Sequence, residues 1–193
     1  SSTTISGYVD TSAIWMIGDG NTVAGRSFDG ANKQDGFNLN VVKLQIEKPL
    51  DESNWAAGYH VGLLFGPDAN ALAATSTGVN NSDFAVKNAF VALRTPVGNG
   101  IEWKVGVFDT LVGYEVFEAG SNPNYSRSFG FFTEPITHTG VLATYQINEI
   151  VGVAAGIANT GGNVINARPT DALGVNVEAL KTYQLKSSSK TVH

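Results

Sequence analysis

Apolar and polar side chains alternate with a period of two residues along much of this chain. The clearest stretch is 55–65, whose one face carries Trp55, Ala57, Tyr59, Val61, Leu63 and Phe65 and whose other face carries Ala56, Gly58, His60, Gly62 and Leu64. Because successive side chains of a β-strand point to opposite faces, this pattern predicts a strand with one bulky apolar face and one face of mostly small residues. The predicted strands are Ile5–Ile17, Phe37–Glu47, Trp55–Phe65, Phe84–Arg94, Ile101–Phe108, Thr139–Ile147, Ile150–Asn159 and Val175–Leu185.

The connections between these strands alternate strictly between short and long. The short ones are Lys48–Asn54, Thr95–Gly100 and Asn148–Glu149, and the long ones are Gly18–Gly36, Gly66–Asp83, Asp109–His138 and Thr160–Gly174. Alternating side chains alone are equally typical of a soluble sandwich, but a sandwich has no reason to place every long loop at one end. Transmembrane barrels do so. The sequence therefore predicts an all-β fold, an antiparallel up-and-down transmembrane β-barrel with about eight strands in one domain, residues 1–193.

Composition narrows the classes of protein that fit. Charged residues make up 15% of the chain, against the roughly 25% usual in soluble domains. The net charge of -5 argues against nucleic acid as a partner, and the absence of cysteine excludes disulfides, zinc–thiolate sites and thiol nucleophiles. No apolar run reaches the roughly 18 residues of a membrane helix. The start, Ser1–Thr4, lacks the apolar segment of a signal peptide, so the sequence is expected to be mature or trimmed.

Aromatic side chains recur on the predicted outward faces, several of them near strand ends. They are Trp15, Trp55, Tyr59, Phe65, Trp103 and Tyr145. Aromatic residues at such places form the girdles of outer-membrane barrels at the lipid headgroups, although each one alone could equally be a core residue. The opposite face of 101–108 carries Glu102 and Lys104, which we expect to point inward, into water.

Five segments together resemble the OmpL-like β-barrel porin family of bacterial outer membranes. They are Asn40–Asp51, Lys87–Arg94, Gly106–Glu115, Asn122–Phe129 and Phe132–Gly140. The resemblance covers roughly residues 6–159 and is most specific over 106–140. It implies localisation in the outer membrane and a porin function, the passive diffusion of small hydrophilic solutes or ions.

The chain departs from that family in two ways. Members are usually about twice as long, and their last strand closes on an aromatic residue, whereas this chain ends with Lys186–His193. One explanation is an eight-stranded barrel that has closed again with a filled interior. We favour the other, a fragment of a larger barrel, because an open edge at Val175–Leu185 would expose unpaired backbone to lipid.

The longest connection, 109–138, is the candidate constriction loop. In trimeric porins the loop at this ordinal position folds inward and narrows the channel, and the analogy is one of position. Four carboxylates against one guanidinium give the loop a local charge of -3, which favours weak cation preference. Alternatively, Glu115 and Glu134 pair with Arg127 to hold the loop in shape. The candidate pore-lining residues are Arg94, Glu102, Lys104, Asp109, Glu115, Glu118, Arg127, Glu134 and His138.

Catalytic and metal sites find little support. Glu115 with Glu118 could form a glycosidase pair, and Asp109, His138 and Ser126 a triad, but carboxylates in a loop are usually solvated and no Gly-x-Ser-x-Gly motif occurs. The three histidines have no metal-ligand spacing. We therefore expect no enzyme activity, metal or cofactor.

The expected partners follow from this interpretation. They are outer-membrane lipid and small hydrophilic solutes, and assembly into a homo-oligomer is compatible with the sequence. Two alternatives to a porin remain at this point. One is a non-conducting barrel that acts as an envelope scaffold or adhesin, and the other is a soluble lectin-like β-sandwich.

Overall fold

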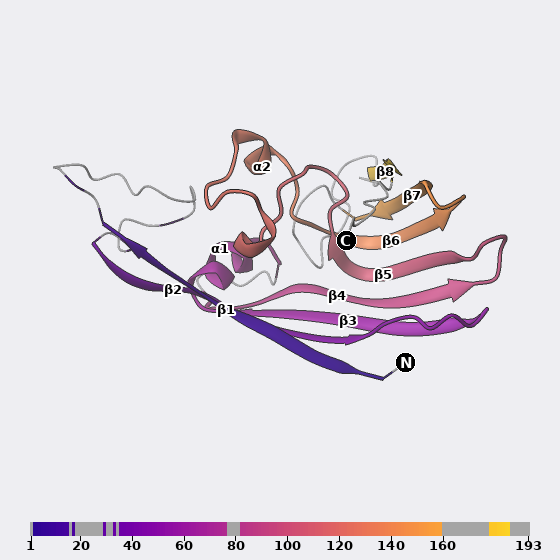
Figure 1. Ribbon diagram of the computed structural model, residues 1–193, viewed down its shortest axis with the longest axis horizontal. Helices are drawn as coiled ribbons and strands as arrows, with labels where there is room; N and C mark the ends of the chain where they lie inside the picture. The colour runs from indigo at the N-terminus through magenta and orange to yellow at the C-terminus, as the bar shows by residue number, and fades with distance from the viewer. Residues whose placement is uncertain are drawn as a thin grey trace, which may run out of the picture.

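One continuous antiparallel sheet contains eight strands in the order in which they occur in the chain (Figure 1). The computed structural model describes residues 2–15, 17, 29, 33, 35–76, 82–159 and 178–185. Its strands are β1 (Thr4–Ile14), β2 (Gly36–Lys48), β3 (Ala56–Phe65), β4 (Phe84–Thr95), β5 (Ile101–Asp109), β6 (Thr137–Gln146), β7 (Val151–Ala158) and β8 (Glu178–Leu185). Each predicted strand is confirmed, and so is the all-β, up-and-down topology.

The described strands do not close into a ring. β1 pairs with β2 at one edge, and β8 pairs with β7 at the other. The sheet instead curves like a trough (Figure 1). The prediction that the chain belongs to a larger barrel stays a prediction, and the predicted loops 18–36 and 160–174 lie largely outside the described residues.

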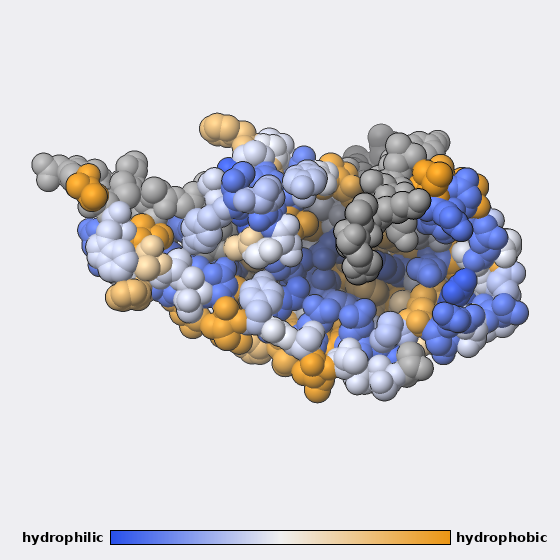
Figure 2. Space-filling view, viewed as in Figure 1, coloured by the Kyte–Doolittle hydropathy of each residue, from blue (hydrophilic) through white to orange (hydrophobic). Residues whose placement is uncertain are grey.

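The two faces of the sheet differ in polarity as the alternation predicts. Along β3 the side chain of Trp55, just before the strand, is 72% exposed and that of Tyr59 is 37% exposed, whereas Leu64 on the other face is 1% exposed. Figure 2 shows hydrophilic residues gathered in the hollow of the sheet and hydrophobic ones along its lower outer margin. Other exposed apolar residues of the strands include Ile5, Val9, Phe37, Leu39, Val91, Leu93, Val105, Val141 and Ile157. An exposed apolar surface of this extent is typical of a membrane or protein interface.

Two β-bulges interrupt the alternation where the sheet approaches its long loops. In the β1–β2 pair the register shifts between Asp10 and Thr11, so Asn40 is the extra residue. In the β3–β4 pair it shifts between Gly62 and Leu63, so Lys87 is the extra residue. Bulges re-aim side chains, and here they turn polar groups toward the concave face. Asn40 and Lys87 are 0% and 2% exposed.

Glycine allows neighbouring strands to lie close together in the middle of the sheet. Gly106 of β5 lies directly opposite Gly140 of β6, and Gly106 has a φ of +132°, a conformation that other residues rarely adopt. A Cβ atom on Gly106 would collide with the carbonyl oxygen of Ala89, and one on Gly140 with that of Ile157.

The concave side of the sheet holds the two described long connections. One contains α1 (Pro67–Ser76), between β3 and β4. The other joins β5 to β6 and contains the 3-10 turn η2 (Ala119–Ser121) and the short α2 (Phe129–Thr133) (Figure 1). We call residues 110–136 the β5–β6 loop. Neither helix, nor any other helix of the described chain, has the length and apolarity needed to cross a membrane.

Candidate functional site

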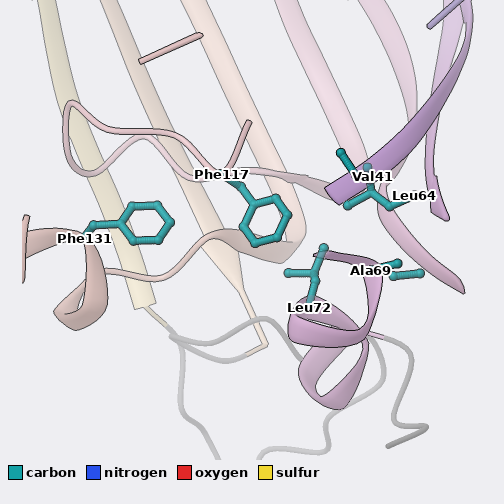
Figure 3. Close-up of a cluster of buried hydrophobic side chains, with 7 residues drawn as sticks. Val41, Leu64, Ala69, Leu72, Phe117 and Phe131 are labelled. Atoms are coloured by element: carbon teal, nitrogen blue, oxygen red, sulfur yellow. The ribbon is translucent and has the colours of Figure 1, made fainter. Parts of the chain in front are cut away.

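The β5–β6 loop is attached to the concave face of the sheet by two phenylalanines. Phe117 and Phe131 are 5% and 6% exposed. They belong to the inner apolar cluster, which consists of Val41, Leu64, Ala69, Leu72, Ala85, Phe117 and Phe131 and is drawn in Figure 3. Burial of one such side chain stabilises a fold by about 1.5–3 kcal/mol. The loop therefore lies inside the curve of the sheet together with α1 and does not extend away from it.

Hydrogen bonds within the loop fix its path. Arg127 donates to the carbonyl oxygens of Val116, Phe117 and Tyr125 at 3.1, 3.0 and 2.8 Å. The side chain of Asn122 accepts from the backbone N–H of Val116 at 2.9 Å and donates to its carbonyl oxygen at 2.8 Å. Arg127 thus holds the shape of the loop through its carbonyl groups.

Glu115 also braces the loop from within. Its carboxylate accepts hydrogen bonds from the backbone N–H of Ser128, at 3.0 Å, and from the Ser128 hydroxyl. Ser128 is the N-cap of α2, where its hydroxyl accepts from the N–H of Phe131. The hydroxyl of Ser128, and after it the N–H, lowers the pKa of Glu115 below 4.5, with Arg127 contributing less. The chief partner of Glu115 is therefore Ser128.

Glu118 reaches from the loop to two lysines of the sheet. Its Oε1 lies 2.8 Å from Nζ of Lys43 on β2 and 3.0 Å from Nζ of Lys87 on β4. Lys87 also contacts Oδ1 of Asp109, at the end of β5, at 2.6 Å, and Asn88 donates to Oδ2 of Asp109 at 3.2 Å. We call these five residues the Glu118 cluster. It joins the loop to β2, β4 and β5 by charge, beside the inner apolar cluster.

The surroundings of Glu118 keep its carboxylate ionised. Burial by itself raises the pKa of Glu118, but the ammonium groups of Lys87 and Lys43 outweigh this and lower it from 4.5 to about 2. A group with a lowered pKa stabilises the folded arrangement fully above its unfolded value. That contribution is lost as the pH falls through the folded value.

The pKa of Glu118 predicts how the loop responds to acid. We expect the loop to stay attached from neutral pH down to about pH 4.5 and to loosen as the pH falls from there toward about 2. Cleavage within the loop by an acid protease such as pepsin, relative to its cleavage of an unstructured peptide at the same pH, should be constant down to about pH 4.5 and rise below it. The same rise in a Glu118→Gln variant, which cannot titrate at this position, would contradict the assignment.

A second polar network lies where β1 and β2 meet the loop. Lys33 donates to Oδ1 of Asn40 at 2.7 Å and to Oδ1 of Asp29 at 2.8 Å. Nδ2 of Asn40 donates to Asp10 at 3.1 Å and contacts the hydroxyl of Tyr125, in the loop, at 3.5 Å. The concave face therefore carries a second set of paired polar groups, on the β1–β2 side of the Glu118 cluster.

Three of the predicted pore-lining residues lie away from the loop. Arg94 stands opposite Glu102 in the β4–β5 register and donates to the carbonyl oxygen of Asn99, in the short turn. The ammonium of Lys104 lies 5.0 Å from the centre of the Phe90 ring. These side chains occupy the short-turn half of the sheet, and their lining of a pore stays a prediction.

The two remaining predicted residues flank the end of the loop. Glu134 borders, with Lys87 and Phe117, a narrow space of about 30 Å³ beneath it. His138, at the start of β6, is fully buried, with its Nε2 3.1 Å from the hydroxyl of Thr110 and its ring 6.3 Å from that of Phe108. The structure therefore brings Asp109 and Glu118 together, whereas His138 is buried against Thr110 and Phe108.

Sequence reasoning missed the cations that face Glu118. Lys43 and Lys87 lie on strands far from the loop in sequence, and nothing in their spacing marks them as partners of Glu118. Lys87 and Asn88 are consecutive polar residues in an otherwise alternating strand, and that break in phase is the signature of the bulge. It was the available signal.

The described side chains of the site offer fixed charge on the concave face. Within the described ranges no group of three or more His, Asp or Glu side chains could hold a metal ion. The charged side chains are engaged with one another across the concave face. Fixed charges of this kind attract ions of opposite sign and repel ions of like sign.

Because Phe117 belongs to the inner apolar cluster, we expect its removal to loosen the loop from the sheet. Phe117→Ala should weaken the attachment of the loop by about 3–5 kcal/mol, since it removes a buried ring and leaves a cavity. Proteolysis of the folded protein within the loop should accelerate strongly. Phe129→Ala is the matched control, because Phe129 is 95% exposed, and it should leave the rate unchanged. Equal rates in the two variants would show that Phe117 does not anchor the loop.

Comparison with known proteins identifies the family to which the chain belongs. The model of the family described as "Putative beta-barrel porin-2, OmpL-like" matches residues 2–192. Neither the curated proteins nor the solved structures give a match.

Proposed function

Because this chain belongs to the OmpL-like β-barrel porin family, we propose that it is a passive diffusion channel for small hydrophilic solutes and ions in the bacterial outer membrane. Family membership and the antiparallel all-β sheet establish a porin-like β-barrel protein. Conduction is the further step. The two faces of the sheet and the position of the loop support it.

The observation that carries the proposal is the attachment of a charged loop inside the curve of the sheet. The Glu118 cluster and the inner apolar cluster hold the β5–β6 loop against the concave face. The convex face is apolar and suits lipid, whereas the concave face is polar and suits water (Figure 2). A loop in this position would narrow a water-filled lumen and leave it open.

The charges near the loop favour cations weakly. The described carboxylates of this region are Asp10, Asp29, Asp68, Asp109, Glu115, Glu118 and Glu134, and the cationic groups are those of Lys33, Lys43, Lys87 and Arg127. The carboxylates are in excess, so the potential inside a narrow, poorly solvated passage should be negative. Because most of these groups are paired, the preference should be modest.

The same observations weigh against the two alternatives. An adhesin would present its longest loop outward to a partner, whereas this loop is packed against the concave face. In a lectin-like sandwich a second sheet would cover the apolar face, whereas the described strands form one sheet whose apolar side chains are exposed. Nothing in the described site suggests catalysis, and a channel requires none.

Solute uptake tests the proposal. Liposomes that contain the protein should swell in an isosmotic solution of a small neutral solute such as glycerol, and more slowly as the solute becomes larger. Liposomes with heat-denatured protein provide the control. Equal swelling rates in the two preparations would rule out diffusion and favour the scaffold.

A further inference from the structure

Open space on the concave side is distributed very unevenly. Between the β5–β6 loop and the sheet, near Phe117 and Lys87, only about 30 Å³ is open, which is room for a few water molecules. Between β1 and residues 118–125 of the loop lies a cavity of about 680 Å³. The inner apolar cluster and α1 thus fill one side of the loop, and the other side is open to a solute.

The cavity has walls on both the sheet and the loop. Tyr8 of β1 lies directly opposite Lys43 in the β1–β2 register. Side chains that face each other in this way project to the same face of a sheet, so Tyr8 shares the concave face with the Glu118 cluster. From the loop side, Tyr125, Ser121 and Asn124 line the same space.

The chemistry of these walls is mixed. Tyr8 and Tyr125 each offer an aromatic ring with a hydroxyl at its end, which suits a ligand that is apolar on one face and polar at its edge. Carboxylates come from Asp10 and Glu118, and the loop adds the hydroxyl of Ser121 and the amide of Asn124. The residues that line the cavity include no lysine or arginine.

We propose that this cavity is the solute-binding subsite of the channel and that it takes neutral polyhydroxyl solutes, that is, small sugars. Sugars present C–H faces to aromatic rings and hydroxyl groups to carboxylates and amides. An anion would find no ammonium or guanidinium group of its own in the lining, because Lys43 and Lys87 lie outside it and are paired with Glu118. The cavity volume falls within the 300–1,000 Å³ typical of small-molecule sites.

The subsite deepens the proposed channel function and rests on it. A solute must bind well enough to enter a pore and weakly enough to leave, so we expect half-saturation only at high sugar concentration. The bound sugar would lie beside the tip of the loop, where it would also impede ions. Binding and conduction can be measured separately, so the subsite can be disproved while the channel is supported, and the channel can be disproved while the subsite is supported.

Saturation-transfer NMR on the intact protein in detergent micelles tests binding, with glucose as the probe. We expect saturable transfer to the glucose protons, and Tyr125→Ala should raise the half-saturation concentration about tenfold through the loss of the ring. Tyr114→Ala is the matched control, because Tyr114 belongs to the same loop, is 84% exposed and lies outside the cavity. It should leave binding unchanged. Asn124→Ala, at an exposed loop position, provides a second variant should Tyr125→Ala disturb folding.

The outcomes separate the subsite from the channel. Saturable binding that Tyr125→Ala or Asn124→Ala weakens and Tyr114→Ala does not supports the subsite, whether or not the protein conducts. If the protein conducts but glucose gives no transfer, or if all variants bind it equally, the subsite is overturned and the channel stands. Glucose binding without conduction would instead overturn the channel alone.

Discussion

Glu118→Gln is expected to shift the channel from weak cation preference to anion preference. The substitution removes the charge that lies between the ammonium groups of Lys43 and Lys87, at 2.8 and 3.0 Å. The positive charges of both lysines would then be less neutralised and would attract passing anions more strongly, although Lys87 would still be paired with Asp109. Breaking a buried pair costs about 3–5 kcal/mol, and we expect the lower end here because of that remaining partner. The zero-current potential in a KCl gradient measures the change in preference.

Glu115→Gln is the control for this result. It removes the same charge from the same loop, but Glu115 is bound to Ser128 and not to the lysines of the sheet. We therefore expect a clearly smaller shift. The shift of Glu118→Gln should also shrink as salt rises, since the Debye length is about 10 Å at 0.1 M. Equal shifts in the two variants would mean that Glu118 has no special position in the passage.

Val61→Arg is expected to impair assembly into a bilayer. Val61 lies near the middle of β3 and faces Ile46 and Ala89 on the neighbouring strands, on the apolar side of the sheet. An arginine on the lipid face near the bilayer midplane costs about 2–4 kcal/mol. Urea unfolding in lipid vesicles, followed by heat-modifiable migration on SDS gels, measures the loss.

A matched substitution on the other face tests the assignment of the two faces. Gln45 lies opposite Gly62 on the concave face and is half-buried, and it donates to Glu47, an acceptor that an arginine could also use. Gln45→Arg should therefore assemble normally. If it destabilised the protein as much as Val61→Arg does, the predicted lipid and water faces would be wrong.

The strands could be predicted from the sequence because their signal is local. Alternation along 55–65 depends only on which face each side chain occupies, and the structure keeps that pattern in Tyr59 and Leu64. The alternation of long and short connections is also read directly from the sequence, and it predicted the up-and-down order of the strands. The bulge at Asn40 was beyond this reasoning, because a one-residue shift depends on pairing with the neighbouring strand, and the bulge at Lys87 is marked only by the adjacent polar residues Lys87 and Asn88.

The candidate site was predicted only in part. The position of the loop in the chain singled out Glu118, but its partners Lys43 and Lys87 come from strands distant in sequence. A count of charges does not distinguish Glu115 from Glu118. In the fold, Glu115 is bound by Ser128 within the loop, and Glu118 is bound by lysines of the sheet. Such differences arise from packing, and no spacing in the sequence encodes them directly.

A cysteine at the tip of the loop tests most directly whether the β5–β6 loop lies in a conducting pore. The chain has no cysteine of its own, so Ser121→Cys provides a single thiol at the cavity, and Ser53→Cys provides one in the β2–β3 turn at the other end of the sheet. In planar-bilayer recordings both variants should conduct. A small charged thiol reagent should then reduce the conductance of Ser121→Cys in discrete steps and leave that of Ser53→Cys unchanged. Absence of conductance, or a Ser121→Cys conductance that the reagent does not alter, would contradict a channel narrowed by this loop.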